Sequence, residues 1–64
     1  MSIENRLRIR LESVNKNIER CKKNAIEEIE KEEMVPATNY LLAMRDLKEQ
    51  QLLIKQMLDT KEEE

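Results

Sequence analysis

Apolar residues recur every three or four positions through the first half of the chain. The series is Ile3, Leu7, Leu11, Val14, Ile18, Cys21, Ala25 and Ile29. At about 100° per residue these positions fall within an arc of about 80°, and charged or amide side chains occupy nearly every other side. Ser2 suits the N-cap position, and Glu4 suits the first turn because a helix N-terminus favours an anion. We predict one helix over about 3–33, with Cys21 as a small buried residue of its apolar stripe.

Pro36 interrupts this pattern and disfavours helical geometry at Val35. Because proline fits the first turn of a helix, we expect Pro36 to open a second helix over about 37–60, after a turn at about 34–36. Such a short connection joins antiparallel neighbours, so the predicted fold is all-α, a two-helix antiparallel hairpin. The hairpin would form a single domain over 1–60, followed by a frayed acidic tail at 61–64. The alternative is one long helix kinked at Pro36 and paired with a second chain.

The second predicted helix is apolar on more sides than one neighbouring helix can cover. Its main stripe consists of Tyr40, Met44, Leu47, Ile54 and Leu58, with Gln51 as a polar member. Two leucine pairs flank this stripe, each about 120° from Leu47: Leu41 with Leu52 on one side, and Leu42 with Leu53 on the other. A helix that is apolar over most of its circumference is normally an interior element. We therefore predict a surface for self-association or partner binding, made of Leu41, Leu42, Leu52, Leu53, Met57 and Tyr40.

Composition removes most kinds of catalytic site. The 64 residues include no glycine, no histidine and one cysteine, Cys21. A phosphate-binding loop, a dinucleotide fingerprint and a nucleophile elbow all need glycine, and a zinc site of Cys and His ligands cannot be built. We expect no enzymatic activity, no cofactor and no metal. The longest apolar run, 40–44, is far below the roughly 20 residues of a membrane span, so we expect a cytoplasmic protein without a membrane partner.

Charge is segregated along the chain. Residues 1–23 have a net charge of +4, residues 24–33 of −4 and the remainder of −2. With position i opposite position 69 minus i, the basic start of the first helix would lie beside Asp59 and residues 62–64 at the acidic end of the second. Arg20 and Lys23 would likewise approach Glu49 and Asp46. The acidic residues near the turn would have no oppositely charged residues beside them within the chain. They form a second candidate partner surface: Glu27, Glu28, Glu30, Glu32 and Glu33.

The same segregation predicts how two copies would associate. In an antiparallel dimer of hairpins, the acidic turn of one copy meets the basic start of the other, whereas a parallel dimer stacks like charges. Two helices of this length also bury little surface alone. We therefore expect an antiparallel four-helix-bundle homodimer, with Gln51 as a polar residue that helps to set the register.

One polar row supports an alternative function. Side chains rich in hydrogen-bond donors follow one flank of the first stripe at spacings of three and four: Arg6, Arg10, Ser13, Asn17, Arg20 and Asn24. Arg6, Arg10, Asn17 and Arg20 could bind nucleic acid or a small anionic, nucleotide-like ligand. The simpler interpretation is the ordinary wet boundary of an amphipathic helix. Because the isoelectric point is 5.2 and the chain has one aromatic residue, we favour a small adaptor, inhibitor or regulator of another protein.

Overall fold

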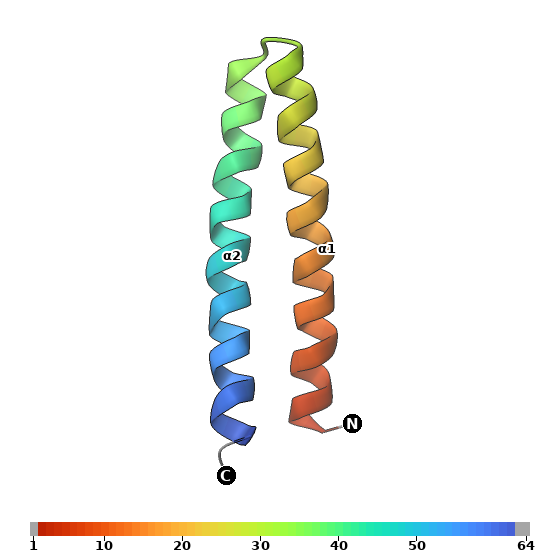
Figure 1. Ribbon diagram of the computed structural model, residues 1–64, viewed down its shortest axis with the longest axis vertical. Helices are drawn as coiled ribbons and strands as arrows, with labels where there is room; N and C mark the ends of the chain where they lie inside the picture. Colours follow the sequence, from red (N-terminus) through yellow and green to blue (C-terminus); the bar gives the residue numbers. More distant parts are fainter. Residues whose placement is uncertain (1, 63–64) are drawn as a thin grey trace.

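Two long helices and one tight turn make up the computed structural model, which describes residues 2–62 (Figure 1). Helix α1 spans Ile3–Glu30 and helix α2 spans Met34–Glu62. The helices lie side by side in opposite directions, so the start of α1 and the end of α2 both lie at the end away from the turn. The molecule measures 49 × 17 × 11 Å. The predicted all-α hairpin is confirmed, and the alternative of one kinked helix is wrong.

The turn is made by a left-handed residue that is not glycine. Glu32 has φ of 62°. Its N–H donates to the carbonyl of Ile29 at 3.0 Å, and the N–H of Glu33 donates to the carbonyl of Glu28 at 2.8 Å. These two bonds form a Schellman motif, in which a left-handed residue after the C-cap closes the end of a helix. The chain therefore ends α1 without the glycine that such a turn usually uses.

The turn lies three residues earlier than the sequence predicts. Helix α1 ends at Glu30 instead of about 33, and α2 begins at Met34 instead of about 37. Pro36 is the third residue of α2, which is possible because the first N–H groups of a helix have no partner within it. Proline therefore marks the first turn of a helix without marking its first residue. Of the predicted tail at 61–64, the first two residues end α2 and the last two lie outside the described residues.

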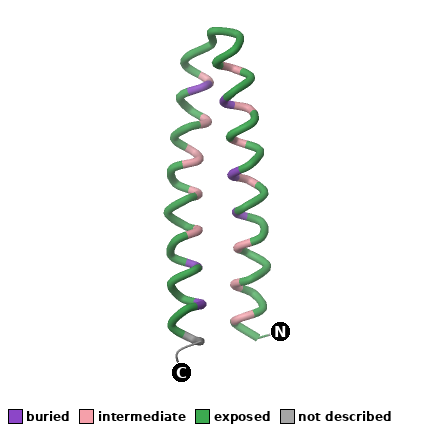
Figure 2. The backbone as a smooth tube through the Cα atoms, viewed as in Figure 1, coloured by how far each residue is buried: buried purple, intermediate pink, exposed green. Residues whose placement is uncertain are grey.

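The core lies along the facing sides of the two helices (Figure 2). Val14 and Ile18 of α1 pack with Ile54 and Leu58 of α2, and partly buried residues complete the cluster: Leu7, Leu11, Met44 and Leu47. Nearer the turn, Ala25 and Ala37 are the most buried described residues, with exposed fractions of 2% and 1%. Small side chains there let the two backbones approach where the turn joins them.

Both ends of the predicted α1 stripe are outside this core. Ile3 is 61% exposed and Ile29 is 46% exposed, because one lies at the open end of the hairpin and the other beside the turn. Cys21 is a free thiol and is half-buried, so it is less enclosed than predicted. The periodicity identified correctly the side of α1 that faces α2. It did not show what length of that side α2 buries.

A side-chain hydrogen bond between the helices shows their register. Gln51 Nε2 donates to Asn15 Oδ1 at 2.6 Å. This pairing places position i roughly opposite position 66 minus i, three positions away from the predicted register. The shift follows from the earlier turn, because shortening α1 at its C-terminal end slides α2 along it. Gln51 thus makes its recorded contact within one hairpin.

Candidate interaction surfaces

The flanking leucines, defined as Leu41, Leu42, Leu52 and Leu53, are all exposed in the single chain. Their exposed fractions are 49%, 45%, 57% and 59%, and that of Met57 is 54%. Tyr40, the remaining member of the predicted association surface, is half-buried along the main stripe of α2. Helix α1 is strongly amphipathic, whereas the apolar residues of α2 are spread around it. One neighbouring helix therefore leaves much of the apolar surface of α2 in contact with water.

The flanking leucines lie on both sides of the face that α2 turns away from α1. Leu47, Ile54 and Leu58 mark the direction of α1. Leu41 and Leu52 are about 120–140° from Leu47 in one sense, and Leu42 and Leu53 are about as far in the other. The two leucine pairs therefore lie on either side of the direction opposite to α1, and the four leucines border one outward surface of α2. Arg45 and Glu49 occupy the middle of that surface, each about 160° from Leu47.

A shallow hollow runs along part of this outward surface. It is lined by Leu41, Met44, Arg45, Lys48, Glu49 and Leu52, all from α2. Arg45 Nε lies 3.7 Å from Asp46 Oδ1, and both side chains are about two-thirds exposed. Met34 and Val35, at the start of α2, extend the exposed apolar surface with fractions of 60% and 74%. The sequence pattern did not indicate these two residues, because the predicted turn at about 34–36 included both.

The acidic residues near the turn surround its backbone hydrogen bonds. Carbonyls of Glu27 and Glu28 accept bonds that close α1, and the carbonyl of Glu33 accepts the first bond of α2 from Ala37. Glu28 is half-buried and lies 3.8 Å from Lys31 Nζ. The side chains of Glu27, Glu30, Glu32 and Glu33 are exposed. The last turn of α1 has no basic residue, so this acidic group lies where the helix dipole disfavours anions.

Members of the polar row on α1 are brought together in two places. Arg20 Nη2 donates to Asn17 Oδ1 at 3.0 Å. Arg6 and Arg10 line a shallow hollow with Ile9 and Ser13. Arg6, Arg10 and Arg20 are exposed and Asn17 is half-buried, so the row borders the core as expected. In the part of the chain that the structure describes, no ion pair connects Arg20 or Lys23 to Asp46 or Glu49, contrary to the predicted cross-helix pairing.

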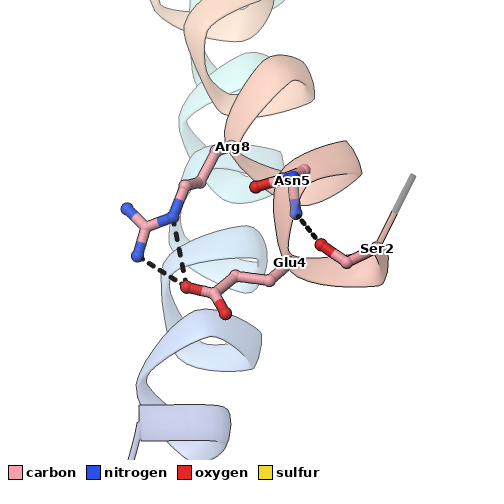
Figure 3. A network of polar contacts seen from close by, with 4 residues as sticks. All are labelled: Ser2, Glu4, Asn5 and Arg8. Carbon is pink, nitrogen blue, oxygen red and sulfur yellow. Dashed lines mark hydrogen bonds and ion pairs between the residues drawn. The ribbon is translucent and has the colours of Figure 1, made fainter.

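Local contacts organise the basic start of α1 (Figure 3). Ser2 Oγ accepts a hydrogen bond from the N–H of Asn5 at 3.1 Å and caps the helix as predicted. Arg8 donates to Glu4 Oε1 through Nε at 3.3 Å and through Nη2 at 2.9 Å. The predicted partners of this region are Asp59 and residues 62–64. The side chains of 62–64 lie outside the described ones, and among the described residues no ion pair joins Asp59 to Arg6 or Arg10. Arg8 is thus bound to Glu4, whereas Arg6 and Arg10 belong to the polar row.

The described residues offer no enclosed polar site. Across residues 2–60 no polar or charged side chain is buried. Over the same described part of the chain, no three acidic or cysteine side chains gather in a way that could hold a metal ion. Neither described helix has a stretch long and apolar enough to cross a bilayer. The candidate functional features of the described residues are exposed surfaces: an apolar one on α2, an acidic one at the turn and a basic one along one flank of α1.

Comparisons with protein families, curated proteins and solved structures found no match to this chain.

Proposed function

We propose that this chain is a non-catalytic interaction protein that binds another protein and regulates it as an adaptor or inhibitor. The observation that carries the proposal is the exposed apolar surface of α2, formed by the flanking leucines and Met57. Clustered exposed apolar residues on a small protein mark sites of association, because leaving them in water is unfavourable.

We also propose that the working form is an antiparallel four-helix homodimer. A hairpin of this size buries a small core, and a second copy would cover apolar surface that one chain leaves exposed. In the antiparallel arrangement, the turn of one copy lies beside the open end of the other.

The acidic turn is the proposed contact for the regulated protein. Four of its five glutamates are exposed, and they lie at one tip of an elongated molecule. Like charges at a helix C-terminus destabilise the isolated hairpin, so a basic partner surface would relieve repulsion when it binds. This contact predicts a partner with a basic binding face.

A capture experiment from native lysate tests the proposal. The tagged wild-type chain is compared with Glu27→Gln/Glu30→Gln/Glu33→Gln, which removes three exposed charges and leaves the left-handed Glu32 in place. The matched control is Glu12→Gln/Glu19→Gln on α1, away from the turn. We expect the turn variant to lose its partner protein while the control retains it. Equal capture by both variants would contradict the acidic turn as the contact.

The alternative is binding of nucleic acid or a small anion through Arg6, Arg10, Asn17 and Arg20. The shallow hollow beside Arg6 and Arg10 favours it. Arg10→Glu/Arg20→Glu is the discriminating variant, with nuclease treatment of the lysate as the control. If this variant abolishes the biological activity of the protein without changing its mass in solution or its helix content, the adaptor proposal fails. Phosphate-mediated binding would also weaken steeply as salt rises, whereas a leucine interface would not.

A further inference from the structure

The outward surface of α2 has an internal symmetry about position 47. Leu41 and Leu42 precede Leu47 by six and five residues, and Leu52 and Leu53 follow it by five and six. Arg45 precedes Leu47 by two residues, and Glu49 follows it by two. Reversing the helix about this position therefore exchanges leucine pair for leucine pair and a cation for an anion. A surface with this property is complementary to a second copy of itself.

We infer that a second copy of this chain packs antiparallel against the outward surface of α2, with the twofold axis at the level of Leu47. This inference rests on the proposed homodimer and assigns its surface and register. Because the contact lies on the side of α2 away from α1, the two α2 helices lie in the middle of the four and the two α1 helices lie outside. Helical geometry places Leu41 against Leu52 of the second copy, and Leu42 against Leu53, on the two sides of the contact. Arg45 then lies at the same level as Glu49 of the second copy, near the axis.

The side chains at the centre are placed for such a contact. Both Arg45 and Glu49 are exposed. Arg45 is 3.7 Å from the exposed Asp46, an exposed contact of the kind that contributes little. Within the described part of the chain, Glu49 makes no recorded ion pair. Two symmetry-related Arg–Glu pairs, shielded by leucines on either side, would gain more than the same groups gain in open solvent.

Charge determines both the orientation and the register of the contact. A parallel pair would bring Arg45 against Arg45 and Glu49 against Glu49. Sliding an antiparallel pair by two helical turns would place leucines against the charged centre and leave charges unpaired. Buried or shielded polar pairs specify register in coiled coils by this penalty on wrong arrangements. The leucines supply the association and the Arg–Glu pairs select one geometry.

The position of the axis also gives nearly the longest possible overlap. Helix α2 spans Met34–Glu62, so its midpoint is residue 48, one position from the axis. Two copies related about Leu47 therefore align along nearly the whole of α2. The turn of each copy comes level with the end of α2 in the other.

Charge reversal in two separate chains tests this geometry. Arg45→Glu leaves acidic groups at both central positions, and Glu49→Arg leaves basic groups at both. We expect each variant alone to dimerise about tenfold or more weakly than wild type, because every central contact becomes repulsive. An equimolar mixture should recover dimers containing one chain of each kind, measured by native mass spectrometry and sedimentation. Dimers in the mixture would show that both variant chains fold. They would also show that the compensating charge lies on the other chain and not on the same helix.

The matched control reverses an exposed pair on α1. Lys16 Nζ lies 3.4 Å from Glu12 Oε1, one turn away, and both side chains are at least 70% exposed. Lys16→Glu and Glu12→Lys should each dimerise like wild type. If the α2 variants also dimerise like wild type, or if their mixture gains no mixed dimer, the inferred contact is wrong. A wild-type dimer insensitive to these charges would overturn this register and leave the proposed function standing.

Orientation needs a separate measurement. In a Cys21→Ser background, chains with Leu41→Cys are mixed with chains carrying Leu52→Cys and treated with a short thiol cross-linker. The antiparallel contact predicts mixed 41-to-52 products in excess of like-with-like products. A majority of 41-to-41 and 52-to-52 products would show a parallel dimer and overturn the inference.

Discussion

Glu32 adopts a conformation that the sequence gives no reason to expect. Left-handed geometry costs a residue with a side chain roughly 1–2 kcal/mol, which is why glycine dominates the position after a helix C-cap. Here a glutamate occupies it with φ of 62° and lies within an acidic group at the end of α1. Two backbone hydrogen bonds and the packing of the helices compensate this local cost. The turn is therefore the most strained element of the hairpin.

Replacing that residue should stabilise the protein. Glu32→Gly relieves the left-handed penalty and removes one like charge, while the extra freedom of glycine in the unfolded chain offsets part of the gain. We expect the free energy of unfolding to rise by about 1 kcal/mol, measured by urea denaturation. Glu30→Gly is the control, since it removes the same charge within α1 and should destabilise. A Glu32→Gly variant no more stable than wild type would show that the left-handed conformation of Glu32 does not destabilise the fold.

Residue identity alone could not locate the turn. Pro36 predicts a turn at about 34–36 and a second helix from about 37, yet any position in the first turn of a helix accepts proline because those N–H groups lack helical partners. The misplacement hid the exposure of Met34 and Val35. Ala37, the most buried described residue, was also not anticipated, because one alanine adds little to an apolar pattern. The hairpin was predictable, and its turn was not.

At the scale of elements, α1 and α2 use their apolar residues differently. The narrow stripe of α1 matched the observed core at Val14, Ile18 and Ala25, because one face with period 3.6 identifies one partner. Helix α2 has both a buried face and an exposed leucine surface. Periodicity predicted that surplus correctly from the sequence. It could not say what covers the surplus, since that information lies in another molecule.

Neighbouring residues of α2 separate these two uses. Ile54 is buried in the core, whereas Leu53 is 59% exposed. Ile54→Ala should lower the free energy of unfolding by about 2–4 kcal/mol and should shift the fraction of dimer little at concentrations where wild type is fully associated. Leu53→Ala should instead weaken dimerisation, measured by sedimentation over a concentration series. Equal effects of both substitutions on association would contradict the division of α2 into two faces.

The Asn15–Gln51 bond is a polar contact at the edge of an apolar stripe. Gln51 lies among Leu47, Ile54 and Leu58 on the face towards α1 and is half-buried. We expect Gln51→Leu to raise the free energy of unfolding by about 1 kcal/mol, because it replaces a partly desolvated amide with apolar packing. Asn15→Ala should lower it by about 0.5–1 kcal/mol. Thermal unfolding followed by circular dichroism measures both, and a destabilised Gln51→Leu would show that the hydrogen bond outweighs packing.

For the whole molecule, the core is small against the length of the helices. Six described residues are buried, in a molecule 49 Å long and only 11 Å thick. Domains of this size approach the limit at which apolar burial can offset the loss of chain entropy. Exposed leucines on α2 are the nearest source of further burial. We therefore expect the association of two hairpins to add to the stability of the fold.

That coupling gives a prediction about concentration. If folding and dimerisation occur together, each tenfold rise in protein concentration adds about 1.4 kcal/mol to the free energy of unfolding per dimer, by mass action. The midpoint of thermal unfolding of the wild-type chain should therefore rise steadily over a hundredfold concentration range. Leu42→Lys/Leu53→Lys should unfold at a lower temperature that no longer depends on concentration, because lysine on the outward surface of α2 prevents the contact. Calorimetry measures both chains, and a wild-type midpoint that stays constant across the range would show that the hairpin is stable as a monomer.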